Sequence, residues 1–97
     1  MTQKVQNASE ALERAKEKNE IFLGRLSQEE LEKTGFDVST FGPFEYADIY
    51  LQCWDERYKI KYIFDSKTEY YEKEDAIGGR DVLLEIVEEY LDIGGEG

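Results

Sequence analysis

The stretch YADIYLQCWDERYKIKYIF, Tyr46 to Phe64, decides the fold because two runs with a period of two follow each other closely. Such alternation is typical of β-strands with one buried face, since successive side chains point to opposite sides of a sheet. The polar residues DER separate the runs, which predicts an antiparallel hairpin. In the first run, the side chains expected to face the core are Ala47, Ile49, Leu51 and Cys53. In the second run, Tyr58, Ile60, Tyr62 and Phe64 face one way, against Lys59, Lys61 and Ile63.

The other face of the first strand is aromatic, with Tyr46, Tyr50 and Trp54 in line. Three aligned aromatic side chains left bare would form an unusual exposed patch. We therefore expect the N-terminal segment to cover this face, with a binding surface as the alternative. Cys53, on the aliphatic face, is expected to be a small buried hydrophobic residue.

The chain after the hairpin predicts one more strand and a helix. TEYYEKE, residues 68–74, follows the turn DSK as a more polar strand, which places it at the edge of a three-stranded antiparallel sheet. Gly78-Gly79 ends the sheet, and residues 80–93 then form a closing helix. Its buried stripe is expected to comprise Leu83, Ile86, Val87, Tyr90 and Leu91.

The segment before the hairpin predicts two helices. Asn7 with Glu10 forms a capping box, and apolar residues at helical spacing extend from about residue 8 to about residue 25. IFLGRL, residues 21–26, could instead form a short strand, which is the less favoured alternative. Ser27 and Glu30 form a second capping box, which opens a short helix that stops at Thr34-Gly35.

This order predicts an α+β fold: an N-terminal helix with a short second helix, a three-stranded antiparallel sheet, and a C-terminal helix. We expect one domain over residues 1–97, with residues 1–6 and 94–97 frayed. No apolar run approaches the ~20 residues of a membrane span, and the N-terminus lacks the apolar core of a signal peptide. Together with a single cysteine, this predicts a cytoplasmic protein without membrane contact.

Composition narrows the class of function. The chain has 12 basic and 23 acidic residues, a net charge of −11, which disfavours direct binding to nucleic acid or to anionic membranes. It has no histidine, the usual general base and the commonest metal ligand. It has no EF-hand loop and no glycine-rich phosphate loop either. We therefore expect no enzyme activity, no metal and no cofactor.

The candidate binding site lies in the acidic last third. On the closing helix, acidic side chains recur at i, i+4, i+7 and i+11 and would form one stripe. Like charges at such spacing cost about 0.2–0.5 kcal/mol per pair, whereas the first helix intersperses lysines. This favours a partner surface, and a solvated face that only serves solubility is the alternative. The predicted residues are Asp81, Glu85, Glu88, Glu89 and Asp92.

The third strand and its exit extend this site with carboxylates and tyrosines, an arrangement that suits a surface of lysine and arginine. A row of fixed negative charge is also what DNA presents to its binding proteins. The alternative is that these acids protect an edge strand against aggregation. The residues are Glu69, Tyr70, Tyr71, Glu72, Glu74 and Asp75.

In topology and charge the chain resembles the small acidic inhibitors that phages use against host defences, including anti-CRISPR proteins that occupy a nuclease's DNA-binding surface. The resemblance rests on the order of YADIYLQCW, YKIKYIF and TEYYEKE, followed by RDVLLEIVEEYLD. It implies that the acidic residues of 69–92 stand in for DNA phosphates.

The expected function is therefore that of a non-catalytic inhibitor that blocks a basic, nucleic-acid-binding surface of a partner such as a defence nuclease. One alternative is an immunity protein or antitoxin that neutralises a nuclease toxin. Another is a structural or assembly subunit whose acidity only serves solubility. The sequence leaves open whether two copies pair through the edge strand to form a homodimer.

Overall fold

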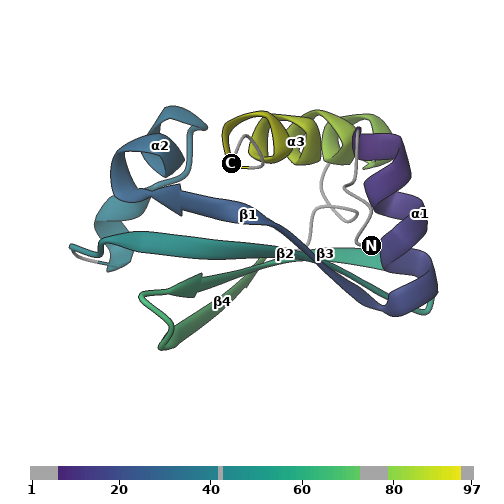
Figure 1. The fold of residues 1–97 in the computed structure, drawn as a ribbon, viewed down its shortest axis with the longest axis horizontal. Coiled ribbons are helices and arrows are strands. Elements are labelled where there is room, and N and C mark those ends of the chain that lie inside the picture. The colour runs from purple at the N-terminus through teal and green to yellow at the C-terminus, as the bar shows by residue number, and fades with distance from the viewer. Residues whose placement is uncertain (1–6, 42, 73–78, 95–97) are drawn as a thin grey trace, which may run out of the picture.

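The computed structural model describes residues 7–41, 43–72 and 79–94, and has an α+β fold with an antiparallel sheet (Figure 1). Neighbouring strands pair in the order β1-β2-β3-β4. The sheet has four strands, so the prediction of three strands is wrong. The elements are α1 (Ala8–Lys18), β1 (Glu20–Ser27), α2 (Gln28–Lys33), the 3₁₀ helix η1 (Val38–Phe41), β2 (Tyr46–Trp54), β3 (Arg57–Phe64), β4 (Thr68–Glu72) and α3 (Gly79–Gly94).

The additional strand, β1, occupies the second half of the predicted first helix. α1 ends at Lys18 because Asn19 adopts a left-handed conformation with φ of 72°, which asparagine tolerates better than most residues. The Asn19 side-chain amide donates to the Cys53 carbonyl oxygen at 3.0 Å, and the Cys53 N–H donates to the Asn19 carbonyl oxygen at 3.0 Å. These two bonds fasten the end of α1 to β2. The prediction of a helix to about residue 25 is therefore wrong, and the alternative strand is the one that forms.

A β-bulge between Phe22 and Gly24 shapes β1. A bulge sets two residues of one strand against one of its partner and so shifts the alternation of side chains. Leu23 and Leu26 are both buried as a result, whereas Phe22 is 53% exposed.

The β2–β3 hairpin is confirmed. Its turn residues Asp55 and Glu56 have φ of 53° and 62°, and Asp65 and Ser66 between β3 and β4 have similar values. Two successive residues with positive φ match the right-handed twist of a tight hairpin. The four predicted core residues of β2 are buried: Ala47, Ile49, Leu51 and Cys53. The matching face of β3 is buried with them: Tyr58, Ile60, Tyr62 and Phe64.

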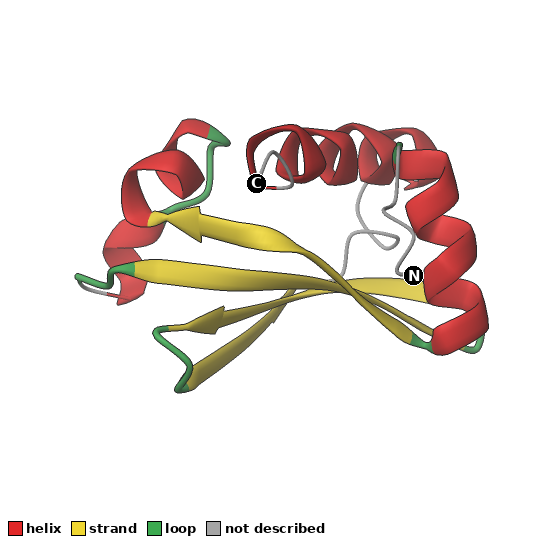
Figure 2. Cartoon of the chain, viewed as in Figure 1, coloured by secondary structure: helices red, strands yellow, loops and turns green. Residues whose placement is uncertain are grey.

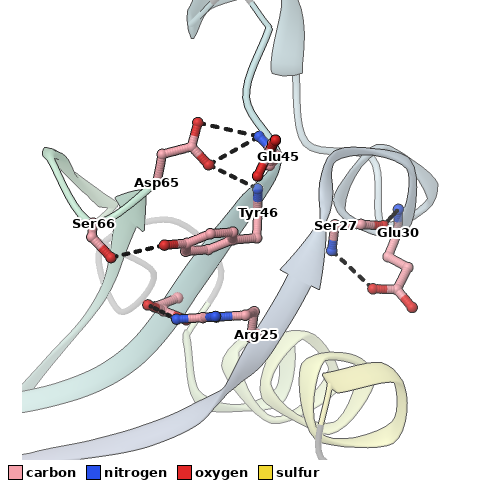
Figure 3. A network of polar contacts seen from close by, with 8 residues as sticks. Arg25, Ser27, Glu30, Glu45, Tyr46, Asp65 and Ser66 are labelled. Atoms are coloured by element: carbon pink, nitrogen blue, oxygen red, sulfur yellow. Dashed lines mark hydrogen bonds and ion pairs between the residues drawn. The ribbon is translucent and has the colours of Figure 1, made fainter.

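Helices α1 and α3 pack beside each other on the apolar face of the sheet (Figures 1 and 2). α1 is fixed by Leu12, whose carbonyl oxygen accepts a hydrogen bond from the Tyr58 hydroxyl at 3.3 Å. α3 is fixed by Tyr90, whose hydroxyl lies 2.7 Å from the Tyr62 hydroxyl in the core. Of the predicted α3 stripe, Leu83, Val87 and Tyr90 are buried, while Ile86 and Leu91 are partly buried. The short helix α2 begins with the predicted capping box of Ser27 and Glu30 (Figure 3).

The opposite face of the sheet is not covered by the described N-terminal residues. Ala8, Ala11, Leu12 and Ala15 of α1 belong to the core on the other side, so the expectation that this segment covers the aromatic face is wrong for the described chain. In the described ranges, no helix is long and apolar enough to cross a membrane.

Candidate functional site

The acidic face of α3 comprises the five predicted carboxylates on this helix, and all five are exposed. The other side of the helix is fixed in the core by Leu83, Val87 and Tyr90. The ion pairs found among the described residues join Arg14 to Glu10, Arg25 to Asp48 and Lys61 to Glu20, so none involves α3. The acidic face thus presents its charge to solvent. Its members are Asp81, Glu85, Glu88, Glu89 and Asp92.

Helix stability does not explain this charge. Asp81 lies in the first turn of α3, where a carboxylate is favourable, but the last turn has no basic residue and ends among carboxylates. In α1, by contrast, Lys16 and Lys18 occupy the last turn and Arg14 pairs with Glu10 at 3.5 Å. The charges of α1 are therefore balanced within the helix, whereas those of α3 are not.

The predicted residues of β4 do not join this face. Glu69 and Tyr71 stand opposite Ile63 and Lys61 of β3, on the face of the sheet that carries no core. Tyr70 is on the core side, with its ring centroid 5.9 Å from that of Phe36. Glu72 ends β4, and Glu74 and Asp75 lie outside the described residues. The structure therefore separates Glu69 and Tyr71 from the α3 carboxylates.

A second surface, here called the open face, is formed by the outward side chains of the four strands. Three of its aromatic side chains are strongly exposed: Phe22 (53%), Trp54 (52%) and Tyr71 (44%). The open face carries four cationic and three anionic side chains, so its net charge is +1, whereas the net charge of the whole chain is −11. The open face comprises Glu20, Phe22, Arg25, Tyr46, Asp48, Tyr50, Gln52, Trp54, Arg57, Lys59, Lys61, Ile63, Glu69 and Tyr71.

A polar network fixes the centre of the open face. The Lys61 ammonium lies 3.1 Å from Glu20 Oε1, which also accepts a hydrogen bond from Gln52 at 2.7 Å. The same ammonium lies 4.9 Å from the centroid of the Tyr50 ring, and Phe22 packs on that ring at 5.3 Å. These contacts hold the central side chains in place before any partner arrives.

The network changes the pKa of both of its charged groups. Burial raises the pKa of Glu20, but the hydrogen bonds from Gln52 and Lys61 and the charge of Lys61 outweigh it, so the pKa lies below its usual value. Burial lowers the pKa of Lys61, but the hydrogen bond and charge of Glu20, with smaller contributions from Tyr71 and Glu69, leave it raised. Both groups stay charged near neutral pH.

A second network fixes the end of the open face next to α2 (Figure 3). Arg25 binds both oxygens of Asp48, at 2.7 and 3.1 Å, and its guanidinium lies 3.8 Å from the centroid of the Tyr46 ring. The hydrogen bond to Asp48 raises the pKa of Arg25. The Tyr46 hydroxyl bonds Ser66 at 3.0 Å, and Asp65 accepts from the N–H of Tyr46 at 3.1 Å. These contacts therefore hold the side chains at this end of the sheet in fixed positions.

The sequence analysis kept the aromatic face of β2 only as an alternative binding surface, and it placed Phe22 in a helix, so the full open face was not predicted. One signal was available: pairing the two hairpin runs puts Lys59 and Lys61 on the same side as Tyr50 and Trp54. Within the described ranges, no group of three or more histidine, cysteine or acidic residues is placed to hold a metal ion. In comparisons with known proteins, no family model, curated protein or solved structure matches this chain.

Proposed function

We propose that the protein is a non-catalytic inhibitor that uses the acidic face of α3 to block a basic, nucleic-acid-binding surface of a partner protein such as a nuclease. The observation that carries this proposal is the set of five exposed α3 carboxylates, none of which takes part in an ion pair with a described residue. Such a fixed row of charge attracts lysine and arginine side chains that otherwise bind phosphates.

The charge density of the acidic face supports this comparison with DNA. Asp81 to Asp92 spans about 16 Å along the helix axis at 1.5 Å per residue. Its five carboxylates are therefore separated on average by about 4 Å along the axis, close to the ~3.4 Å between phosphates of one DNA strand. A groove that follows a phosphate backbone would meet a similar row of charge on α3.

The anchoring of α3 also supports inhibition by a rigid surface. Because Leu83, Val87 and Tyr90 are buried, the helix backbone is fixed before the partner arrives, and less conformational freedom is lost on binding. The charge would accelerate encounter and make the affinity depend on salt. The resemblance to phage anti-defence inhibitors points to a defence nuclease. A nuclease toxin would offer the same kind of surface.

The proposal is tested by reversing charge on α3. The variant E88K/E89K changes the charge of the acidic face from −5 to −1, and E13K/E17K on the exposed side of α1 makes the same change in net charge elsewhere. Each protein is used to capture partners from host lysate at low salt, and the captured proteins are eluted with duplex DNA.

We expect the wild type and E13K/E17K to retain a nucleic-acid-binding protein that duplex DNA or high salt displaces, and E88K/E89K to lose it. If E88K/E89K captures the same protein equally well, the acidic face serves solubility and the proposal fails.

A further inference from the structure

The open face leaves aromatic side chains exposed to water. Phe22, Trp54 and Tyr71 are each about half exposed. Since an aromatic side chain can bury ~150–250 Å², these three offer roughly 300 Å² for contact. An interface of standard size buries about 800 Å² on each partner, so these rings would supply roughly a third of one partner's share.

Charge favours the open face over the acidic face of α3 for a contact between two copies. The acidic face of α3 repels a second copy, whereas the open face has a net charge of +1 and faces away from α3. In such a contact the two acidic helices would lie on the outer sides of two packed sheets, which alone are about 10 Å apart, more than one Debye length of about 8 Å at physiological salt. Two copies can therefore approach through their open faces while their acidic helices stay screened from each other.

The strand register shows that the open face is complementary to itself. Residues opposite each other in the sheet form rows across the strands. A two-fold axis that runs parallel to the strands, above the open face and between β2 and β3, sets each row against the same row of the second copy. It lays β1 over β4 of the second copy and β2 over β3. The facing residues, one from each copy, are then Phe22 with Tyr71, Tyr50 with Lys61, Arg25 with Glu69, Trp54 with Arg57, Gln52 with Lys59, and Asp48 with Ile63.

Four of these six pairings are attractive, while Asp48 and Gln52 stay bonded to Arg25 and Glu20 of their own copy. Phe22 with Tyr71 buries two half-exposed rings, and Arg25 with Glu69 joins opposite charges. Tyr50 with Lys61 and Trp54 with Arg57 place a cation on an aromatic ring. None of these pairs joins two like charges. From this complementarity we propose that the open face is the interface of a homodimer in which two sheets pack face to face around a two-fold axis parallel to the strands.

The first test measures mass. Sedimentation equilibrium of the full chain from micromolar to millimolar concentration should show a monomer–dimer equilibrium that strengthens as salt rises, because the repulsion between two chains of −11 is screened. W54A should weaken dimerisation by about tenfold, because Trp54 is one of the half-exposed aromatic residues of the proposed interface. R57E should also weaken it, and E88K/E89K on α3 should leave the dimer intact.

Trp54 and Arg57 are exposed, so both variants should keep the wild-type circular dichroism spectrum. A wild type that stays monomeric over the whole concentration range would refute the proposal. So would a dimer that both W54A and R57E leave unchanged.

The second test measures geometry with a short bismaleimide cross-linker. The proposed axis sets Phe22 of one copy over Tyr71 of the other, whereas the two Phe22 residues lie three strand spacings apart, about 14 Å. A mixture of F22C and Y71C should therefore cross-link much faster than either variant alone, and the wild type should not react because Cys53 is buried. Efficient cross-linking of Y71C to itself would instead indicate pairing through the β4 edge and would exclude this axis.

Discussion

Reversing two charges on α3 should stabilise the fold, although the same change should abolish the proposed partner binding. Glu88 and Glu89 are exposed, and neither takes part in an ion pair among the described residues. Their replacement by lysine in E88K/E89K therefore removes no contact that holds α3 to the core. What changes is the interaction with the neighbouring carboxylates and with the negative end of the helix dipole.

The size of the effect follows from the spacing. Five pairs of α3 carboxylates stand three or four residues apart, and each like-charge pair costs about 0.2–0.5 kcal/mol. Four of these pairs become attractive in E88K/E89K, so the free energy of unfolding should rise by about 2 kcal/mol at low salt. For a domain of this size, that corresponds to an increase in Tm of roughly 8–15 °C. The five pairs are Asp81–Glu85, Glu85–Glu88, Glu85–Glu89, Glu88–Asp92 and Glu89–Asp92.

Thermal unfolding followed by circular dichroism, at low and at high salt, measures this effect. The control E13K/E17K on α1 breaks two attractive pairs and gains one, so its free energy of unfolding should fall by less than about 1 kcal/mol. A higher salt concentration should reduce the increase in the free energy of unfolding of E88K/E89K, because salt screens exposed charges. An unchanged or lower Tm for E88K/E89K at low salt would mean that the α3 carboxylates do not repel one another. The field on which the proposed function depends would then not exist.

Three further predictions concern the fold. N19A should cost about 1–2 kcal/mol, whereas N19G should cost less, because glycine keeps the left-handed cap and loses only the bond to Cys53; urea unfolding separates the two. E20Q should flatten the acid side of the stability profile. The pKa of Glu20 lies below its usual 4.5, so its contribution, under about 1 kcal/mol, is present above that pH and lost as pH falls through the folded pKa. The pKa of Lys61 is raised above 10.5, so its contribution to the free energy of unfolding is lost as the pH rises through the folded pKa. Unfolding measured from acid to alkaline pH tests the predictions for Glu20 and Lys61. L12A should cost about 3–5 kcal/mol in the same unfolding assay, since Leu12 is fully buried.

The hairpin was predictable because its alternation leaves one register that buries the apolar residues. The missing strand β1 was not, because Ile21, Phe22 and Leu23 are consecutive apolar residues that fit a helix and a strand equally well. Asn19 ends the helix and allows the strand to form, through its left-handed backbone and its hydrogen bonds to Cys53, 34 residues away in the chain. Such a contact is invisible to local periodicity.

The candidate site divides in the same way. The acidic face of α3 follows from helical spacing alone, so it could be predicted without knowledge of the fold. The positions of Tyr70 and Tyr71 could not, because neighbouring residues on a strand point to opposite faces, and only the packing of α1 and α3 shows which face is the core. The open face depended on the same long-range information.

The two proposed surfaces respond to salt in opposite directions, which allows one titration to separate them. Binding of a basic partner to the α3 carboxylates weakens as salt rises, whereas association of two chains that each carry a net charge of −11 strengthens. Because the surfaces face away from each other, one does not block the other. A complex measured at moderate salt should therefore contain two copies of this chain and two partner molecules, and raising the salt should release the partner while the dimer persists. W54A should convert it to a complex of one inhibitor chain with one partner without loss of inhibition. If W54A also abolished inhibition, the open face and not α3 would be the surface that recognises the partner.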